Sequence, residues 1–385
     1  MPKRTKREEE EVESEEEVVD QVNEDEEEQD DDDDTATTST TSTTSTTTTT
    51  NSKKKSAKTD ADDESKRIMD IFHIDNIDKL TEHEFHAVFD TMANRLLNDV
   101  VLMVGGVPHM LNEIEYYFKG YNHVDQYAHG DVNQQKMCTW YFHRQNGGAY
   151  KTASYKGLDM TFGDGTAFAG ILIRGIERVD NKPVLIDGPS LCVDHLLKVA
   201  GEATIDAFVA KHGTSLLPGD NKHMHLVMRD HAALKKPVVQ KPIASGRVGL
   251  TMKLYRKDKE YYFGRDYRYI RMPDKVKKGK HYMNTALYKQ GMKAQEIKDV
   301  TKSTIASIGN CIKAFDAGVK KTKSKADLDK YKGSLSNDDV CELVGVCHAL
   351  EKMRGSSSTT TNDTAAHEDD VVDGADEGEA LESDE

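Results

Sequence analysis

The chain has 385 residues, 68 acidic and 52 basic side chains and a formal net charge of −16. Residues 1–65 hold 23 acidic and 8 basic side chains and residues 355–385 hold 11 acidic and none basic, which leaves 34 acidic and 44 basic in residues 66–354. This central region is therefore +10 and suits a polyanionic partner, while the lack of an apolar run near the roughly 18 residues of a membrane span excludes a bilayer-spanning protein.

The two ends have the composition of disordered tails. Residues 1–65 and 355–385 are acidic or rich in Thr and Ser, and such segments cannot bury enough apolar surface to offset the entropy of the chain. The acidic tracts could fold back on the basic centre, bind basic proteins such as histones, or only keep the chain soluble. The basic residues 2–7, PKRTKR, predict a nuclear protein. The five cysteines form no C-x-x-C pair, as expected of a reduced intracellular protein.

Order is expected to begin near Arg67. Thr81 and Glu84 form a capping-box pattern, and apolar residues at helical spacing follow, which predicts a helix of about four turns from Glu82. Residues 100–104 and 107–111 are β-prone and flank two glycines, which indicates a tight hairpin.

The second strand of this hairpin continues into the sequence EIEYYF, residues 113–118. Side chains alternate along a strand, so Ile114, Tyr116 and Phe118 are expected on one face, and the opposite face is expected to carry Glu113, Glu115 and Tyr117.

Further elements follow in chain order. Strands are expected at 137–142, 149–157, 167–176 and 182–186, helices at 191–199 and 205–211, and a hairpin from 248–255 and 260–270. Residues 294–317 and 336–353 have helical patterns. His223, His225 and His231 have a spacing that could ligate a metal, but we expect no metal site, because no cysteine is nearby and no third ligand has a diagnostic spacing. The expected fold is α+β, a mixed and mainly antiparallel β-structure with flanking helices. We divide it into a domain at 66–274 and a Lys-rich helical extension at 275–354.

Arg174 interrupts an otherwise apolar strand. A buried arginine needs a carboxylate partner, and Glu113 or Glu115 is the natural candidate. A carboxylate held by a cation in a half-apolar pocket is one form of a positioned general base. Solvated glutamates and an arginine that reaches out to water are the alternative.

Several motifs, in order, resemble the alkyladenine (3-methyladenine) DNA glycosylases between about residues 92 and 270. The resemblance is carried by 113–117 (EIEYY), 128–129 (AH), 148–155 (GAYKTASY), 171–177 (ILIRGIE), 188–192 (GPSLC) and 245–249 (SGRVG). No single motif is decisive, and the shared order of six is the stronger signal.

The resemblance implies a role for each matching residue. Glu115 would deprotonate a water that attacks the anomeric carbon of a flipped nucleotide, and Arg174 would help to hold that water. Further roles follow position by position: Tyr117, His129 and Thr152 in the base pocket, Tyr155 as the wedge that fills the space of the flipped base, and Lys151, Lys156 and Arg247 at the DNA backbone.

The sequence departs from the family in its pocket. Thr152 stands where the family has a second stacking tyrosine, and Phe162 or Gly163 where it has an asparagine that excludes guanine. The loop before His129 is three residues longer, and Lys156 is an addition. The catalytic pair therefore matches the family better than the specificity pocket does.

Three functions remain open from the sequence. The first is a monomeric, monofunctional glycosylase for alkylated or deaminated purines that binds damaged duplex DNA and needs no cofactor. The second is a non-catalytic nucleic-acid or chromatin binder on the same scaffold. The third is an interaction protein whose acidic tails bind histones.

Overall fold

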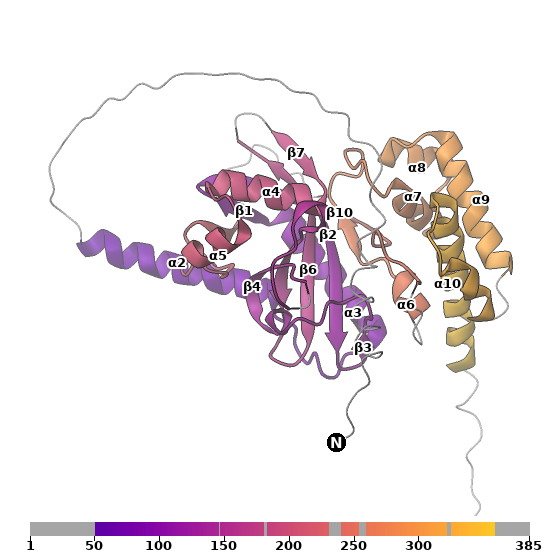
Figure 1. The fold of residues 1–385 in the computed structure, drawn as a ribbon, viewed down its shortest axis with the longest axis horizontal. Helices are drawn as coiled ribbons and strands as arrows, with labels where there is room; N and C mark the ends of the chain where they lie inside the picture. Colours follow the sequence, from indigo (N-terminus) through magenta and orange to yellow (C-terminus); the bar gives the residue numbers. More distant parts are fainter. Residues whose placement is uncertain are drawn as a thin grey trace, which may run out of the picture.

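The computed structural model describes residues 51–145, 147–180, 183–230, 240–253, 259–321 and 325–358. It is an α+β protein with a mainly antiparallel sheet and flanking helices, as predicted at that level (Figure 1). The main path of the sheet runs β4 (Met137–Phe142), β5 (Leu158–Phe162), β6 (Phe168–Arg178), β2 (Val107–Gly120), β1 (Val100–Val104) and β8 (Met224–Met228). Among the described helices, none is both long enough and apolar enough to cross a bilayer.

The N-terminal tail is shorter than predicted. Helix α2 spans Asn51–Phe72, so residues 51–65 are helical, and the remaining expected tails at 1–50 and 359–385 lie outside the described residues. The last turns of α2 bury Ile68 and Phe72 in the core, and the Glu64 carboxylate accepts the backbone N–H of Met228 on β8. These contacts stabilise a helix that composition alone does not predict.

The predicted helix and hairpin are confirmed. Helix α3 spans Glu82–Asn98, and the Glu84 carboxylate accepts the Thr81 backbone N–H at 2.7 Å. Strands β1 (Val100–Val104) and β2 (Val107–Gly120) pair antiparallel. The turn between them consists of Gly105 and Gly106, whose φ angles are +54° and +82°. Glycine adopts such positive φ angles without strain, and this conformation favours a two-residue hairpin turn.

The two faces of β2 differ as predicted. Tyr116 stacks on Phe89 of α3 with 4.6 Å between ring centroids, and the Phe118 ring packs against that of Phe85 with 4.7 Å between centroids. The opposite face carries Glu115 and Tyr117, which hydrogen-bond to each other. One strand therefore supplies both the core and a polar face.

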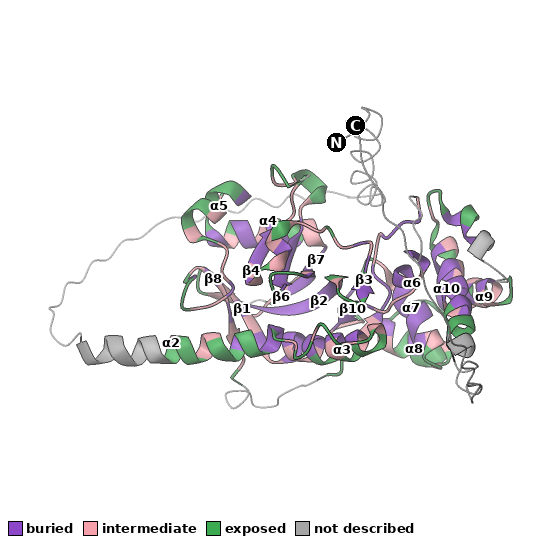
Figure 2. Cartoon of the chain, turned by 90° about the horizontal axis from the view of Figure 1, so that it is seen from below, coloured by how far each residue is buried: buried purple, intermediate pink, exposed green. Residues whose placement is uncertain are grey.

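The other elements complete two layers of helices around the sheet. Figure 2 shows α3 along one side of the sheet and α4 and α5 along the other. The remaining elements of the central part are β3 (His123–Val124), η1 (Val132–Gln135), β4 (Met137–Phe142), β5 (Leu158–Phe162), β6 (Phe168–Arg178), β7 (Val184–Asp187), α4 (Pro189–Ala200), α5 (Ile205–His212), β8 (Met224–Met228) and β9 (Ile243–Ser245).

The prediction of a strand at 149–157 is wrong. This segment contains a short 3-10 turn, η2 (Ala153–Tyr155), and no strand. His143 explains the difference, because its backbone C=O accepts from Lys151 and its N–H donates to Gly157. These two hydrogen bonds to the His143 backbone close residues 151–157 into a loop.

The predicted hairpin of 248–255 and 260–270 is also wrong. Residues 254–258 lie outside the description, and Lys259–Phe263 form the short helix α6. Strand β10 (Arg268–Ile270) pairs with β2 on one side and β9 on the other. The buried ion pair between Arg268 and Glu113 accompanies this long-range pairing.

The C-terminal helices pack into the same core. They are α7 (Lys280–Lys289), α8 (Ala294–Thr301), α9 (Ile305–Lys321), η3 (Lys325–Tyr331) and α10 (Asn337–Ser358). Phe315 of α9 and Leu343 of α10 belong to the hydrophobic cluster that also contains the α3 residues. The single helix predicted at 294–317 is interrupted, because Lys302 adopts a left-handed conformation with φ +55°.

Candidate active site

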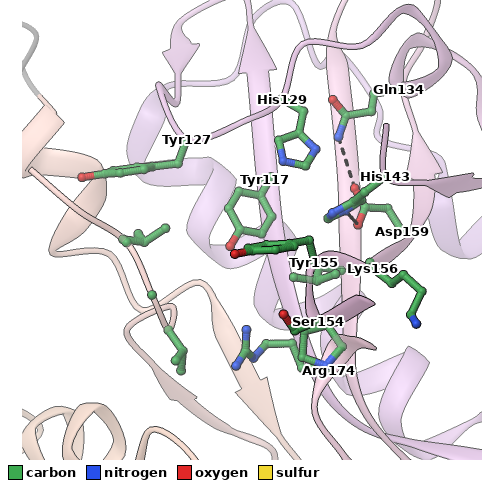
Figure 3. Close-up of a pocket in the computed structure, with 16 residues that line it drawn as sticks. Tyr117, Tyr127, His129, Gln134, His143, Ser154, Tyr155, Lys156, Asp159 and Arg174 are labelled. Atoms are coloured by element: carbon green, nitrogen blue, oxygen red, sulfur yellow. Dashed lines mark hydrogen bonds and ion pairs between the residues drawn. The ribbon is translucent and has the colours of Figure 1, made fainter. Parts of the chain in front are cut away.

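A pocket of about 310 Å³ lies on the polar face of the sheet. Asp159 of β5 is opposite Leu172 of β6, and Leu172 is opposite Glu115 of β2, so these side chains share one face. The pocket is lined by Tyr117, Tyr127, His129, Gln134, His143, Ser154, Tyr155, Lys156, Gly157, Asp159, Leu172, Arg174, Pro189, Val248, Gly249 and Leu250 (Figure 3).

The Glu115 carboxylate lies fully buried behind the wall of this pocket. Its Oε2 accepts the Tyr117 hydroxyl at 2.9 Å, and its Oε1 accepts the Val248 backbone N–H at 2.8 Å and lies 3.3 Å from Arg174 Nε. All three partners line the pocket. An ionised carboxylate has about four acceptor positions, so the two hydrogen bonds and the ion-pair contact leave capacity for a further donor, such as a water.

Arg174 contacts both glutamates that the sequence left as candidates. Its Nε donates to Glu113 Oε1 at 2.8 Å, and Arg268 Nε donates to the same oxygen at 2.7 Å. Burial opposes ionisation of Glu113, but the Arg268 and Arg174 guanidinium groups hold the pKa of its carboxyl below the usual value. Glu113 is therefore a structural anion that fixes two arginines, and Arg174 presents its charge to Glu115.

Tyr117 is held between an anion and a cation. Burial and then the Glu115 charge raise the pKa of its phenol well above the usual value, so it stays protonated and donates to Glu115. The Arg247 guanidinium carbon lies 4.6 Å from the centroid of the Tyr117 ring. Of the groups that hold Glu115, Tyr117 is thus fixed by the buried Arg247 and Arg174 by the Glu113 carboxylate.

Arg247 cannot contact the DNA backbone as predicted. It is fully buried, forms an ion pair with Asp125, and donates to the backbone carbonyls of Tyr116 and Tyr262, both at 3.0 Å. A guanidinium enclosed in this way stabilises the fold and is out of reach of a phosphate.

A second polar cluster lies at the opposite end of the pocket from Arg174 (Figure 3). His143 Nε2 is 2.8 Å from Asp159 Oδ1, and Gln134 donates to Asp159 Oδ2 at 3.2 Å. The His129 ring lies against His143, with 4.4 Å between centroids. The sequence analysis missed this cluster, although an aspartate within the apolar run 158–162 is a signal for it.

Gly170 makes space for this cluster. It lies opposite Tyr117 in the sheet, and a Cβ at this position would be 2.5 Å from Asp159 Oδ2 and 2.9 Å from Gln134 Nε2. A glycine is therefore required for the aspartate to lie across β6.

The other predicted residues are only partly brought together. His129 and Tyr155 line the pocket, and Tyr155 is 39% exposed in η2. Lys156 also lines it and is paired with Asp194 at 2.8 Å. The prediction for Thr152 is wrong, because its side chain is exposed and does not line the pocket.

One further predicted residue lies away from the pocket wall. Lys151 is half-buried and is not among the lining residues. Tyr127 was not predicted and supplies an additional aromatic wall, with its hydroxyl donating to the Thr251 backbone carbonyl at 3.1 Å.

The histidines considered as metal ligands have other contacts. His223 Nε2 lies 2.9 Å from the Ala200 backbone carbonyl, and its ring stacks on His212 at 4.0 Å. His231 lies outside the described residues. Within the part of the chain that the structure describes, no three His, Cys, Asp or Glu side chains converge to suit a metal ion.

The fold and site define an α+β protein with an aromatic and polar pocket over a buried carboxylate–guanidinium pair. The chain belongs to the same family as the uncharacterized protein L759 of Acanthamoeba polyphaga mimivirus. The two are 30% identical over 221 residues, which cover 52% of this chain and 95% of the relative. No family model matches the chain. Because the name of this relative carries no activity, the functional argument depends on the site.

Proposed function

We propose that this protein is a monofunctional DNA glycosylase that hydrolyses the N-glycosidic bond of alkylated or deaminated purines, on a scaffold like that of the alkyladenine DNA glycosylases. The observation that carries the proposal is the position of Glu115. A buried carboxylate is held by a phenol, a guanidinium and a backbone amide that all face one pocket.

The pocket suits one extruded base. Its volume of about 310 Å³ is at the lower end of the range of ligand pockets. Tyr117 and Tyr127 offer ring faces for stacking, and His129 and Gln134 offer hydrogen bonds to the base edge. An enzyme that acts on a base in a duplex must extrude it into such a stacking and hydrogen-bonding pocket.

The chemistry requires a base, a cation and a leaving group. Glu115 takes a proton from water, the water oxygen bonds to the anomeric carbon, and the bond from this carbon to the purine nitrogen breaks with its electron pair leaving on the purine. The carboxylate also stabilises the oxocarbenium character that develops at the sugar. An N-alkylated cationic purine leaves as a neutral base and needs no acid, whereas a neutral deaminated purine leaves as an anion and takes up the proton that Glu115 removed from the water. Arg174, 3.3 Å from Glu115 Oε1, orients the water.

The surface beside the pocket supports a nucleic-acid partner. Tyr155 is exposed at the pocket on a 3-10 turn, where a ring can occupy the space that a flipped base leaves. Lys151 and Lys156 flank it in the same loop and would contact phosphates. The excess of basic over acidic residues between positions 66 and 354 has the sign that DNA binding needs.

The test is excision from defined oligonucleotides. The purified full chain is incubated with duplexes that contain hypoxanthine, ethenoadenine or a methylated purine, and alkali then converts abasic sites into strand breaks. We expect cleavage at one or more of the damaged positions and none at normal purines. No cleavage of any damaged duplex would contradict the proposal.

One observation favours a second candidate, a non-catalytic binder of damaged or undamaged DNA. Both Glu115 oxygens already accept hydrogen bonds, and the residue does not itself line the pocket. A binder would retain affinity for the duplexes above without releasing a base, so direct binding measured beside the excision assay separates the two functions.

A further inference from the structure

The helices α8 and α9 form a compact unit away from the pocket. Ile297 of α8 and Ile308 of α9 belong to a small apolar cluster with Ile270, Val276, Met283 and Leu287, while Phe315 farther along α9 packs in the main core. Three residues connect the two helices, and Lys302 among them is left-handed. A short helix, a tight turn and a second helix over a three-helix core are the arrangement of helix-turn-helix proteins.

Buried polar contacts define the turn. The Thr301 and Ser303 hydroxyls lie 3.2 and 3.0 Å from Asn284 Oδ1 of α7, and 2.9 Å from each other. These three residues are buried. These contacts tie the turn to α7 through Asn284 Oδ1, while Asn284 Nδ2 is buried without a hydrogen-bond partner among the described residues, and they fix the direction in which α9 leaves the turn. Thr304 then caps α9 by accepting the Ser307 backbone N–H at 3.1 Å.

The first half of α9 presents an open face of short side chains. Ile308 and Cys311 point into the core, while the exposed positions are Ile305, Ala306, Ser307, Gly309, Asn310 and Lys313. Small side chains let a helix approach a groove closely, and Ser, Asn and Ala are residue types that contact base edges in the major groove.

Gly309 has no packing role within the described chain. A Cβ at this position would meet no atom within 4 Å, whereas one at Gly318 would lie 2.0 Å from the Glu342 backbone oxygen and one at Gly345 would lie 2.2 Å from that of Phe315. The last two glycines let α9 and α10 cross closely. A glycine inside a helix costs about 1 kcal/mol relative to alanine, and no described residue requires a glycine at position 309, whereas the close approach of a partner would.

The charge of this unit identifies the partner. Residues 275–321 contain 11 lysines, no arginine and 3 acidic residues. Lys293, Lys298, Lys302 and Lys313 are exposed on or beside α8 and α9. A positive unit with an open helix face is complementary to a duplex, because exposed lysines can neutralise phosphates.

We propose that α8 and α9 are a helix-turn-helix element that binds duplex DNA, with the N-terminal half of α9 in the major groove. The element is separate from the pocket, since none of the residues that line the pocket belongs to α8 or α9. It therefore binds undamaged DNA and does not depend on the proposed glycosylase activity.

The experiment measures binding of the full chain to a labelled, undamaged duplex of mixed sequence by fluorescence anisotropy. Gly309→Leu places a large uncharged side chain on the exposed face of α9. Asn310→Ala removes the proposed contact with a base, and Lys313→Ala removes the proposed contact with a phosphate. We expect each substitution to weaken binding of the duplex roughly tenfold. The melting temperature of Gly309→Leu should be the same as that of the wild type or higher. The matched control is Lys79→Ala, an exposed lysine in the loop between α2 and α3, which should bind like the wild type.

The result that overturns the proposal is wild-type affinity in Gly309→Leu and Lys313→Ala, or no binding of the duplex by the wild type. Base excision is assayed in the same preparations and separates the two proposals. If the protein excises bases and Gly309→Leu leaves its duplex binding unchanged, only the helix-turn-helix element is refuted. If the protein does not excise bases but Gly309→Leu weakens duplex binding, the element is supported.

Discussion

The Arg174 Nε atom of β6 lies 3.3 Å from the Glu115 Oε1 atom of β2, across a strand pair that is buried on both sides. Burial alone would lower the pKa of the arginine, but the charges of Glu115 and Glu113 raise it above its usual value. The cation is therefore permanent, and it lies beside a carboxylate that has almost no contact with solvent. Four predictions follow from this arrangement and its surroundings.

Glu113→Gln should destabilise the protein by about 3–5 kcal/mol, because it leaves two buried guanidinium groups, those of Arg174 and Arg268, without their shared carboxylate. Chemical denaturation measures the change. The matched control is Glu177→Gln, which breaks the less buried pair with Arg271 and should cost less than about 1 kcal/mol. Equal losses in the two variants would contradict the structural role of Glu113.

Stability should fall as the pH is lowered from 7 to 4, in part because of His123. Its Nδ1 lies 2.8 Å from the Phe118 carbonyl and its Nε2 lies 2.9 Å from the Tyr267 hydroxyl. Burial lowers the pKa of His123 from 6.5 to about 4, so between these values the unfolded chain binds a proton that the folded chain does not. The stabilisation by the neutral ring is complete above pH 6.5 and is lost on acidification, at most on the order of 3 kcal/mol.

His123→Gln isolates this contribution. The variant is less stable at pH 7, and its free energy of unfolding should decline less between pH 7 and pH 4 than that of the wild type, measured by denaturation at several pH values. Parallel curves for the two proteins would show that His123 does not titrate as proposed.

Gly170→Ala should lower excision more than it lowers stability. The new methyl group would meet the Asp159 carboxylate and the Gln134 amide, and these side-chain ends can move aside at small cost. This movement breaks the contact between Asp159 and His143, and it changes the end of the pocket opposite Arg174. We expect a drop of at least tenfold in excision with a shift in melting temperature of a few degrees. Unchanged excision would mean that the Asp159 cluster does not contact the base.

Lys156→Ala should reduce the salt dependence of DNA binding, since each phosphate contact contributes about 0.9 to the slope of log K against log salt concentration. Affinities for one duplex are measured at several salt concentrations, again with Lys79→Ala as the control. Equal slopes in Lys156→Ala and the wild type would place this lysine outside the interface and leave it as the partner of Asp194.

Local patterns in the sequence were sufficient for much of this site. The capping box of α3, the double-glycine hairpin and the alternation along β2 each depend on neighbouring residues, and together they predicted the opposed faces of Tyr116 and Glu115. The pairing of Arg174 with glutamates was also predictable, because a cation inside an apolar strand requires an anion.

Long-range and single-residue features were not predictable in the same way. Arg268 reaches Glu113 from 155 residues away because β10 joins β2, and the local pattern suggested a hairpin instead. In the local sequence Arg247 resembles a surface cation, because its buried ion-pair partner Asp125 is distant along the chain. The break after α8 occurs at a lysine, which rarely adopts the left-handed conformation, so no breaker residue indicated it.

The most direct test of the account is single-turnover excision by Glu115→Gln, with Tyr117→Phe as a second variant. The amide keeps the size of the side chain but cannot accept a proton from water, so the account predicts a loss of 10²- to 10⁴-fold or more in the rate, with affinity for the damaged duplex nearly unchanged. Tyr117→Phe removes one donor to Glu115 and should cost less. Excision by Glu115→Gln at the wild-type rate would contradict the assignment of Glu115 as the general base.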